Sequence, residues 1–193
     1  MNSNNLDKRY VWHPYTQMKL WNNSDNITIQ SGRNFSFVDS NERSYLDGIS
    51  NMWCNVWGHD RTEIIDSMKN QLDTLPHSSL FGLVNEPSAK LAKRLITIAK
   101  GMSKVFYTDN GSTAIETALK IAIQYWNNKG KTQKREFICL KNGYHGDTIG
   151  CMSIGYVDGY FSPYRSLLLK TIKVDSPTIR HEKFRQHDIE QYV

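Results

Sequence analysis

The sequence predicts an α/β fold in which a small antiparallel meander precedes the beginning of a parallel or mixed sheet. Three observations lead to this fold class. Short β-prone runs near the N-terminus alternate with polar turns, two apolar stripes at helical spacing follow them, and the pattern then becomes strand, helix, strand. Strands separated by a helix imply a right-handed crossover in a parallel sheet.

The meander is predicted from three short apolar runs, at residues 27–29, 35–38 and 45–46. Polar residues, 31–34 and 39–42, separate them and are typical of turns. We therefore interpret residues 1–50 as an N-terminal segment that contains the meander.

Two amphipathic helices follow the meander. From Thr62 to Leu75, apolar residues recur at helical spacing, and Glu86-Pro87 begins a second stripe that Gly101 ends. Proline is favoured in the first turn of a helix, and glycine is favoured just beyond the last turn.

The remaining elements form a strand–helix–strand series. We predict a strand at 105–107, a helix to about Trp126, a strand at 137–140, and a weaker helix and strand at about 148–153 and 171–174. Two or three strands are too few for a parallel sheet covered on both faces. We therefore interpret residues 51–193 as an incomplete larger domain, with a charged tail from Pro177.

The turn before the long helix has the composition of an anion site. Gly111 and Ser112 lie at the helix start, where backbone N–H groups are free and the helix dipole is positive. Thr113 and Glu116 have the spacing of a capping box. The pattern predicts a phosphate site, although the segment Thr108–Thr113 taken alone is more often a turn and cap that bind nothing.

A second polar loop, Lys141–Thr148, follows the next predicted strand. Loops after parallel strands gather at one edge of the sheet, so Tyr144 and His145 are expected near the Gly111-Ser112 turn. An aromatic ring beside a phosphate site predicts a flat, phosphorylated aromatic ligand. The alternative is an Asn-Gly turn with a half-buried tyrosine.

Two aromatic segments near the N-terminus, Trp12–Met18 and Asp47–Trp53, could form a wall for the substrate of such a site, although aromatic clusters usually belong to a core. For His13, beside Pro14, and for His59, beside Asp60, we predict buried or capping roles and no catalytic one.

Composition excludes several classes of function. The net charge of +5 comes from scattered cations without a recognition motif, which disfavours a nucleic-acid partner. The three cysteines lie far apart and lack metal-ligand spacing, so we expect reduced thiols in a cytoplasmic protein and no metal. We see neither a secretory signal nor an apolar run long enough to span a membrane.

Together these motifs resemble the class III aminotransferases, which are fold-type I pyridoxal-phosphate enzymes. The matching segments run from the N-terminal region to about Gly150: Trp12–Thr16, Asp47–Ser50, His77–Gly82, Asp109–Trp126 and Asn142–Thr148. The resemblance covers the N-terminal part of the family fold, somewhat under half of its usual length. The first segment and the region near Trp53 are most similar to the biotin-pathway branch, although Met52 stands where relatives often have a second tryptophan.

The resemblance implies roles for individual residues. Gly111 and Ser112 would hold the phosphate of pyridoxal 5'-phosphate, and Tyr144 would stack on its ring. Tyr15 and Trp53 would line the substrate pocket. Asp147 would be a supporting acid near Tyr144.

The implied reaction transfers an amino group from S-adenosylmethionine to 8-amino-7-oxononanoate, and the family implies a homodimer. The Schiff-base lysine and the acid that pairs with the cofactor's pyridinium are expected in later segments of the family. We therefore assign no catalytic residue, and expect the chain alone to be inactive. Lys141 and Lys170 have no context that supports the lysine's role.

Three alternatives stay open at this point. The chain could belong to another class III enzyme that acts on ornithine, 4-aminobutyrate or a similar ω-amine. It could be a non-catalytic interaction module, or one half of a split enzyme completed by a second chain, because exposed sheet edges favour association. A nucleic-acid role is the least favoured.

Overall fold

The computed structural model describes residues 2–155, 157 and 159–176. The chain divides into two compact units, Met1–Ala89 and Lys90–Val193, and each is described by itself. The expected tail from Pro177 lies outside the described residues. The predicted domain boundary after residue 50 stays a prediction.

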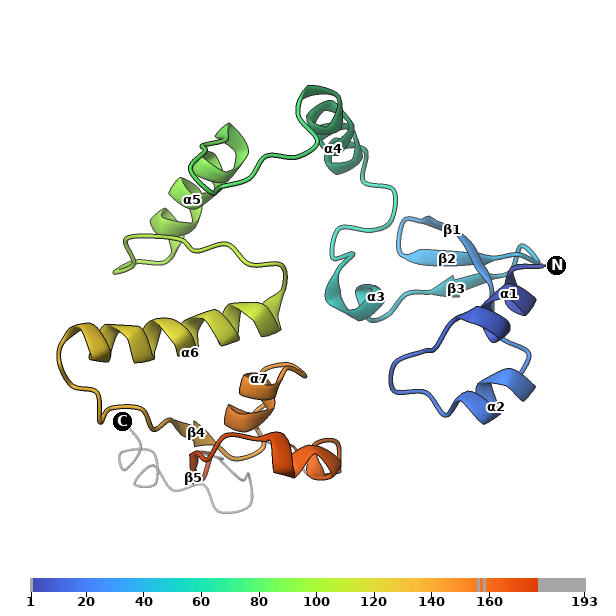
Figure 1. The fold of residues 1–193 in the computed structure, drawn as a ribbon. Coiled ribbons are helices and arrows are strands. Elements are labelled where there is room, and N and C mark those ends of the chain that lie inside the picture. The colour runs from blue at the N-terminus through green and yellow to red at the C-terminus, as the bar shows by residue number, and fades with distance from the viewer. Residues whose placement is uncertain (1, 156, 158, 177–193) are drawn as a thin grey trace, which may run out of the picture. The chain divides into compact units, whose positions relative to one another are not determined.

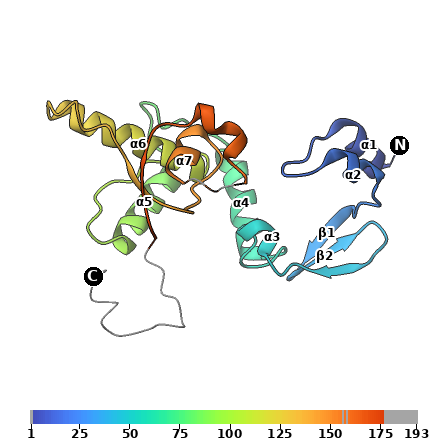
Figure 2. The same ribbon diagram turned by 90° about the horizontal axis from the view of Figure 1, so that it is seen from below.

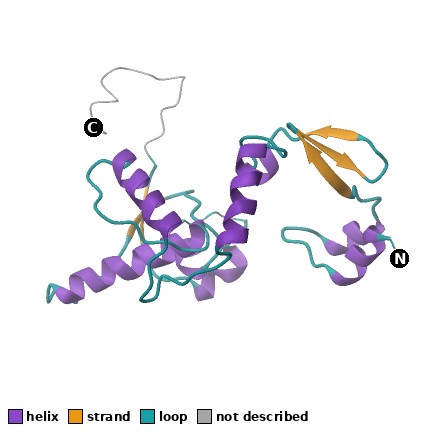
Figure 3. Cartoon of the chain, turned by 90° about the horizontal axis from the view of Figure 1, so that it is seen from above, coloured by secondary structure: helices purple, strands orange, loops and turns teal. Residues whose placement is uncertain are grey.

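The first unit contains the predicted meander. Strands β1 (Ile29–Arg33), β2 (Ser36–Asp39) and β3 (Ser44–Leu46) form an antiparallel sheet in the order β1-β2-β3, drawn in orange in Figure 3. Phe37 is central, since it pairs with both Gly32 and Tyr45. Our boundary for the first strand was wrong: β1 extends through residues predicted as a turn, because Arg33 pairs with Ser36 and leaves a two-residue turn.

Asp39 organises the second turn of the meander. Its buried carboxylate accepts hydrogen bonds from the amides of Asn41 and Arg43, from Arg43 Nε and from the Tyr45 hydroxyl, at 2.8–2.9 Å. Burial alone would raise the pKa of Asp39, but these four hydrogen bonds outweigh it and lower the pKa to about 2. The turn is therefore built around an ionised carboxylate.

Helices surround the meander in sequence. The structure has α1 (Ser3–Tyr10) and α2 (Met18–Asn23) before it, and α3 (Ser50–Trp53), α4 (Thr62–Thr74) and α5 (Glu86–Ile98) after it. The two amphipathic helices predicted from sequence are thus confirmed. Neither α4 nor α5 buries a residue against the parts of the chain that the structure describes.

The second unit contains α6 (Gly111–Asn128), β4 (Ile138–Leu140), α7 (Ile149–Ile154), the 3-10 helix η1 (Ser162–Leu167) and β5 (Ile172–Val174). Strands β4 and β5 pair in parallel, with Cys139 opposite Lys173. The strand predicted at 137–140 and the weaker helix and strand predicted at about 148–153 and 171–174 therefore occur, and the parallel pair is formed by β4 and β5 with α7 between them in sequence.

The strand predicted at 105–107 is wrong. Residues 102–108 have no regular secondary structure, because β4 and β5 pair only with each other among the described residues. Apolar character alone does not make a strand when its backbone groups have no ladder partner.

A small core lies where α7 packs on α6 (Figures 1 and 2). Its buried apolar side chains are Cys139, Cys151, Met152 and Phe161. Among the described residues, none of the helices has both the length and the apolar character that crossing a bilayer requires.

Candidate functional site

The N-terminus of α6 is capped by Asn110. The Asn110 side chain accepts a hydrogen bond from the Thr113 amide at 3.0 Å, and Thr113 Oγ1 accepts one from the Asn110 amide at 3.1 Å. The capping box predicted from Thr113 and Glu116 is therefore wrong. The box consists of Asn110 and Thr113, and the N-cap lies three residues earlier than predicted. Asparagine is as good an N-cap as serine, and this cap leaves the next two amides unused.

Gly111 and Ser112 present those two amides. No described residue supplies an acceptor for them, and both lie at the positive end of an 18-residue helix. A Cβ added at Gly111 would meet no atom within 4 Å, so the space beside it is open. Orphan amides beside open space at a helix N-terminus fit the phosphate of a cofactor.

The loop after β4 packs directly on this helix start. A Cβ at Gly146, where φ is +120°, would collide with the Ser112 hydroxyl and lie 2.8 Å from Ser112 Cβ. The Cys151 thiol lies 3.3 Å from the Ser112 carbonyl oxygen. The structure thus brings together the two loops that the sequence analysis expected at one edge.

Glu116 fixes this arrangement from the middle of α6. Its carboxylate accepts a hydrogen bond from the Gly150 amide at 2.7 Å, in the first turn of α7. Gly150 is buried, and a Cβ there would lie 2.8 Å from Glu116 Cδ. Glu116 therefore links α6 to α7, the helix that follows the Lys141–Thr148 loop.

Tyr144 projects from that loop and is 58% exposed. Its ring stacks on the buried ring of Phe161, with centroids 6.4 Å apart and planes inclined by 23°. One aromatic surface is thus supported from within the unit, while the side chain stays accessible to a flat ligand. Asp147 is exposed three residues further along.

Tyr15 and Trp53 belong to the first unit. Both are well exposed, at 75% and 72%, and both have a left-handed backbone conformation, with φ of 52° and 72°. For residues other than glycine this conformation costs about 1–2 kcal/mol each. Such strain concentrates at functional sites, which agrees with a binding role without assigning one.

The two histidines flagged in the sequence have structural partners. His13 Nε2 lies 2.9 Å from the Asp7 carboxylate, and His59 Nε2 lies 2.9 Å from Asp47 Oδ2. The prediction of buried or capping roles is thereby confirmed for His59, whose side chain is only 8% exposed, and His13 is half-buried.

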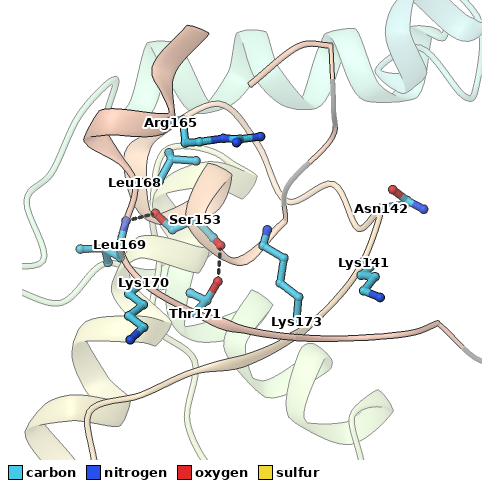
Figure 4. A pocket seen from close by; sticks show the side chains of 9 residues that line it. All are labelled: Lys141, Asn142, Ser153, Arg165, Leu168, Leu169, Lys170, Thr171 and Lys173. Atoms are coloured by element: carbon cyan, nitrogen blue, oxygen red, sulfur yellow. Dashed lines mark hydrogen bonds between the residues drawn. The ribbon is translucent and has the colours of Figure 1, made fainter. Parts of the chain in front are cut away.

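A basic cavity of about 490 Å³ lies on another part of the second unit (Figure 4). Ser153 joins its walls, since its hydroxyl accepts from the Leu169 amide at 2.8 Å and its carbonyl accepts from the Thr171 hydroxyl at 3.0 Å. Lys141 is paired with Asp175 at 2.7 Å, and Arg165 also has a partner. We therefore assign no ligand to this cavity.

Sequence reasoning missed three residues that shape the site. Asn110 stands at the N-cap, and its position directly before Gly-Ser was the available signal. Glu116 was taken for a capping residue because of its spacing. Phe161, which supports Tyr144, lies outside every motif, and no local signal could have identified it.

Comparisons with known proteins agree with this geometry. The family model for class III aminotransferases matches residues 20–193. An adenosylmethionine-8-amino-7-oxononanoate aminotransferase from Geobacter sulfurreducens is 46% identical over 172 residues, which cover 89% of this chain and 38% of that protein.

Solved structures give the same result. The crystal structure of the enzyme of that name from Methanocaldococcus jannaschii matches with a TM-score of 0.88 at 42% identity, covering 92% of this chain and 41% of that one. The ω-transaminase from Pseudomonas jessenii, in complex with PMP, matches with a TM-score of 0.90 at 28% identity, covering 99% and 44%.

The chain thus spans about two fifths of the length of the relatives that it matches. The fold is the N-terminal part of the class III transaminase fold, as the sequence predicted. Since the family model covers most of its residues, the chain belongs to the class III aminotransferases.

Proposed function

We propose that the chain contributes to an aminotransferase of biotin biosynthesis, which moves an amino group from S-adenosylmethionine to 8-amino-7-oxononanoate with pyridoxal 5'-phosphate as cofactor. The observation that carries this proposal is the packing on Ser112 of the Gly146 loop, the loop from which exposed Tyr144 projects, beside the two unused amides of Gly111 and Ser112. The names of the 36–46% identical relatives support the choice of substrates.

Each site residue has a proposed task. The amides of Gly111 and Ser112, with the Ser112 hydroxyl, donate hydrogen bonds to the cofactor phosphate at the positive end of α6. Tyr144 stacks on the cofactor ring and excludes water from one of its faces, and Asp147 is a supporting acid. When bound, the cofactor supplies an electron sink for cleavage of bonds to the amino carbon.

Tyr15 and Trp53 are proposed to bind substrate, since both present exposed aromatic surface. We assign no lysine of this chain to covalent attachment of the cofactor, and propose that the isolated chain binds the cofactor without turnover. A homodimer, a cytoplasmic location and the absence of a nucleic-acid partner remain proposals from the sequence.

Titration of the chain with pyridoxal 5'-phosphate, followed by cofactor absorbance, tests the site. We expect Ser112→Ala to weaken binding about tenfold, because it removes a donor to a charged group. Tyr144→Ala should weaken binding about fivefold through lost stacking. Tyr125→Ala, which removes a similarly exposed ring near the C-terminal end of α6, is the matched control. Equal affinity in all four proteins would refute the site.

Another class III ω-aminotransferase is the second candidate, because the fold overlaps equally well with an ω-transaminase. Calorimetric binding of S-adenosylmethionine, ornithine and 4-aminobutyrate to the cofactor-loaded chain separates the two. Preference for S-adenosylmethionine, reduced by Trp53→Ala, supports the first candidate, and preference for ornithine or 4-aminobutyrate supports the second.

A further inference from the structure

The four residues of α3 have left-handed backbone conformations, so this short element is a left-handed turn and not a right-handed α-helix. The φ values of Ser50, Asn51, Met52 and Trp53 are 50°, 48°, 55° and 72°, and the chain returns to right-handed geometry at Cys54. None of the four is glycine. In this region the Cβ atom of an L-residue crowds the following carbonyl oxygen, so left-handed residues normally occur singly. A run of four requires contacts that hold it.

Asp47 supplies contacts from just before the turn. Its Oδ1 accepts a hydrogen bond from the Asn51 amide at 2.8 Å, and its carbonyl oxygen accepts one from the Ser50 amide at 3.3 Å. Its Oδ2 lies 2.9 Å from His59 Nε2. The carboxylate is only 4% exposed, so water competes little for these contacts.

His59 joins that carboxylate to the sheet. Its ring lies 4.4 Å from the ring of Phe37 on β2, and its amide donates to the Asn34 carbonyl at 2.8 Å. A Cβ at Gly32 on β1 would lie 2.6 Å from His59 Cβ, so the histidine is packed tightly on the strand. The histidine is therefore held against the meander.

Asn55 sets the hydrogen-bonding direction of the imidazole. Asn55 Nδ2 lies 3.0 Å from His59 Nδ1, and an amide nitrogen can only donate. His59 Nδ1 therefore accepts, and Nε2 holds the proton that is donated to Asp47. The amide of Asn55 donates to the Ser50 carbonyl at 2.9 Å, which closes the loop around the turn.

We infer that Asp47 and His59 are positioning residues, which hold the Ser50–Trp53 turn in its left-handed conformation and so fix how Trp53 is presented to substrate. The part of this inference that concerns substrate rests on the proposed function. The part that concerns the turn does not, because it follows from contacts within one unit. Trp53 itself is 72% exposed and depends on its backbone for orientation.

Amide hydrogen exchange in the 193-residue chain tests the inference. The amides of Asn51, Trp53 and Asn55 donate to Asp47 Oδ1, to the Ile49 carbonyl and to the Ser50 carbonyl. In Asp47→Ala we expect all three amides to exchange at least about tenfold faster, because the turn loses the carboxylate that bonds both the Asn51 amide and His59. The amides of β2 and β3 should keep the parent's rates.

A conservative variant and a matched control complete the design. Asp47→Asn keeps an oxygen acceptor for the Asn51 amide but places an N–H group against the Nε2 proton of His59, so it should restore the exchange of Asn51 to within about threefold of the parent and that of Trp53 and Asn55 only in part. Asp7→Ala breaks the other His–Asp pair of the same unit, and should leave the turn unchanged.

Fluorescence gives an independent signal from Trp53. The difference between each protein and its Trp53→Phe counterpart isolates this tryptophan from the other four in the chain. Its anisotropy should fall in Asp47→Ala, and by less in Asp47→Asn.

Unchanged turn amides in Asp47→Ala would overturn the inference, as would turn and sheet amides that accelerate together. If Asp47→Ala does not fold, His59→Leu, which removes the donor to Asp47 Oδ2, is judged by the same criteria. No measurement here uses cofactor or substrate. A failure to bind pyridoxal phosphate would therefore refute the proposed function without affecting the conclusion drawn from hydrogen exchange.

Discussion

Replacement of Glu116 by alanine tests how the two loops of the candidate site are held together. Glu116 accepts a hydrogen bond from the buried Gly150 amide at 2.7 Å. Its removal leaves that amide without an acceptor, which costs about 1–3 kcal/mol, with the upper half expected because the acceptor is charged. We therefore expect the free energy of unfolding to fall by about 2–3 kcal/mol, or roughly 30- to 150-fold in the folding equilibrium.

Urea denaturation followed by circular dichroism, with exchange of the Gly150 amide, measures this effect. Glu116→Gln retains an acceptor oxygen and should lose about 1 kcal/mol or less. Glu63→Ala removes a glutamate that is 68% exposed on α4, and should change stability by at most about 0.5 kcal/mol. The reasoning is refuted if Glu116→Ala unfolds like the parent protein, or if Glu63→Ala loses as much.

Three further perturbations have definite outcomes. Because the folded pKa of Asp39 lies near 2, below the ordinary value of about 3.9, its stabilisation is complete above about pH 4 and is lost as the pH falls towards 2. The thermal unfolding midpoint of the parent should fall as the pH is lowered across that range. In Asp39→Asn the part of this pH dependence that comes from Asp39 should be absent. Gly146→Ala should destabilise by about 2 kcal/mol or more in urea, since its Cβ would strike Ser112, while Gly111→Ala, which faces open space, should not. Asn110→Ala should lower stability by about 1 kcal/mol in the same assay through loss of the N-cap, and a value near zero would contradict the capping role.

Features that depend on local sequence were predictable. The meander, α4, α5 and α6 each have a periodic apolar pattern bounded by turn or cap residues, and all four occur. The meeting of the Ser112 turn with the loop after β4 was also predicted, on the premise that a parallel strand precedes each of them, and it occurs although residues 105–107 form no strand.

Features that depend on distant partners were not predictable. Residues 105–107 have the composition of a strand, but no described neighbour supplies a ladder for them. Glu116 stands three residues after Thr113, as in a capping box, yet its carboxylate accepts a hydrogen bond from the Gly150 amide, 34 residues away. The left-handed turn at Ser50–Trp53 contains no glycine, so nothing in its own sequence signals the conformation.

The hydrogen bonds of the Asp39 carboxylate bear on the order in which the chain folds. Its donors, in Asn41, Arg43 and Tyr45, stand two, four and six positions away, whereas Glu116 and Gly150 are separated by 34. Closing a short loop sacrifices less chain entropy than closing a long one. We expect the β2–β3 hairpin to form early, as a nucleus emerging from the ribosome, well before the α6–α7 junction can assemble.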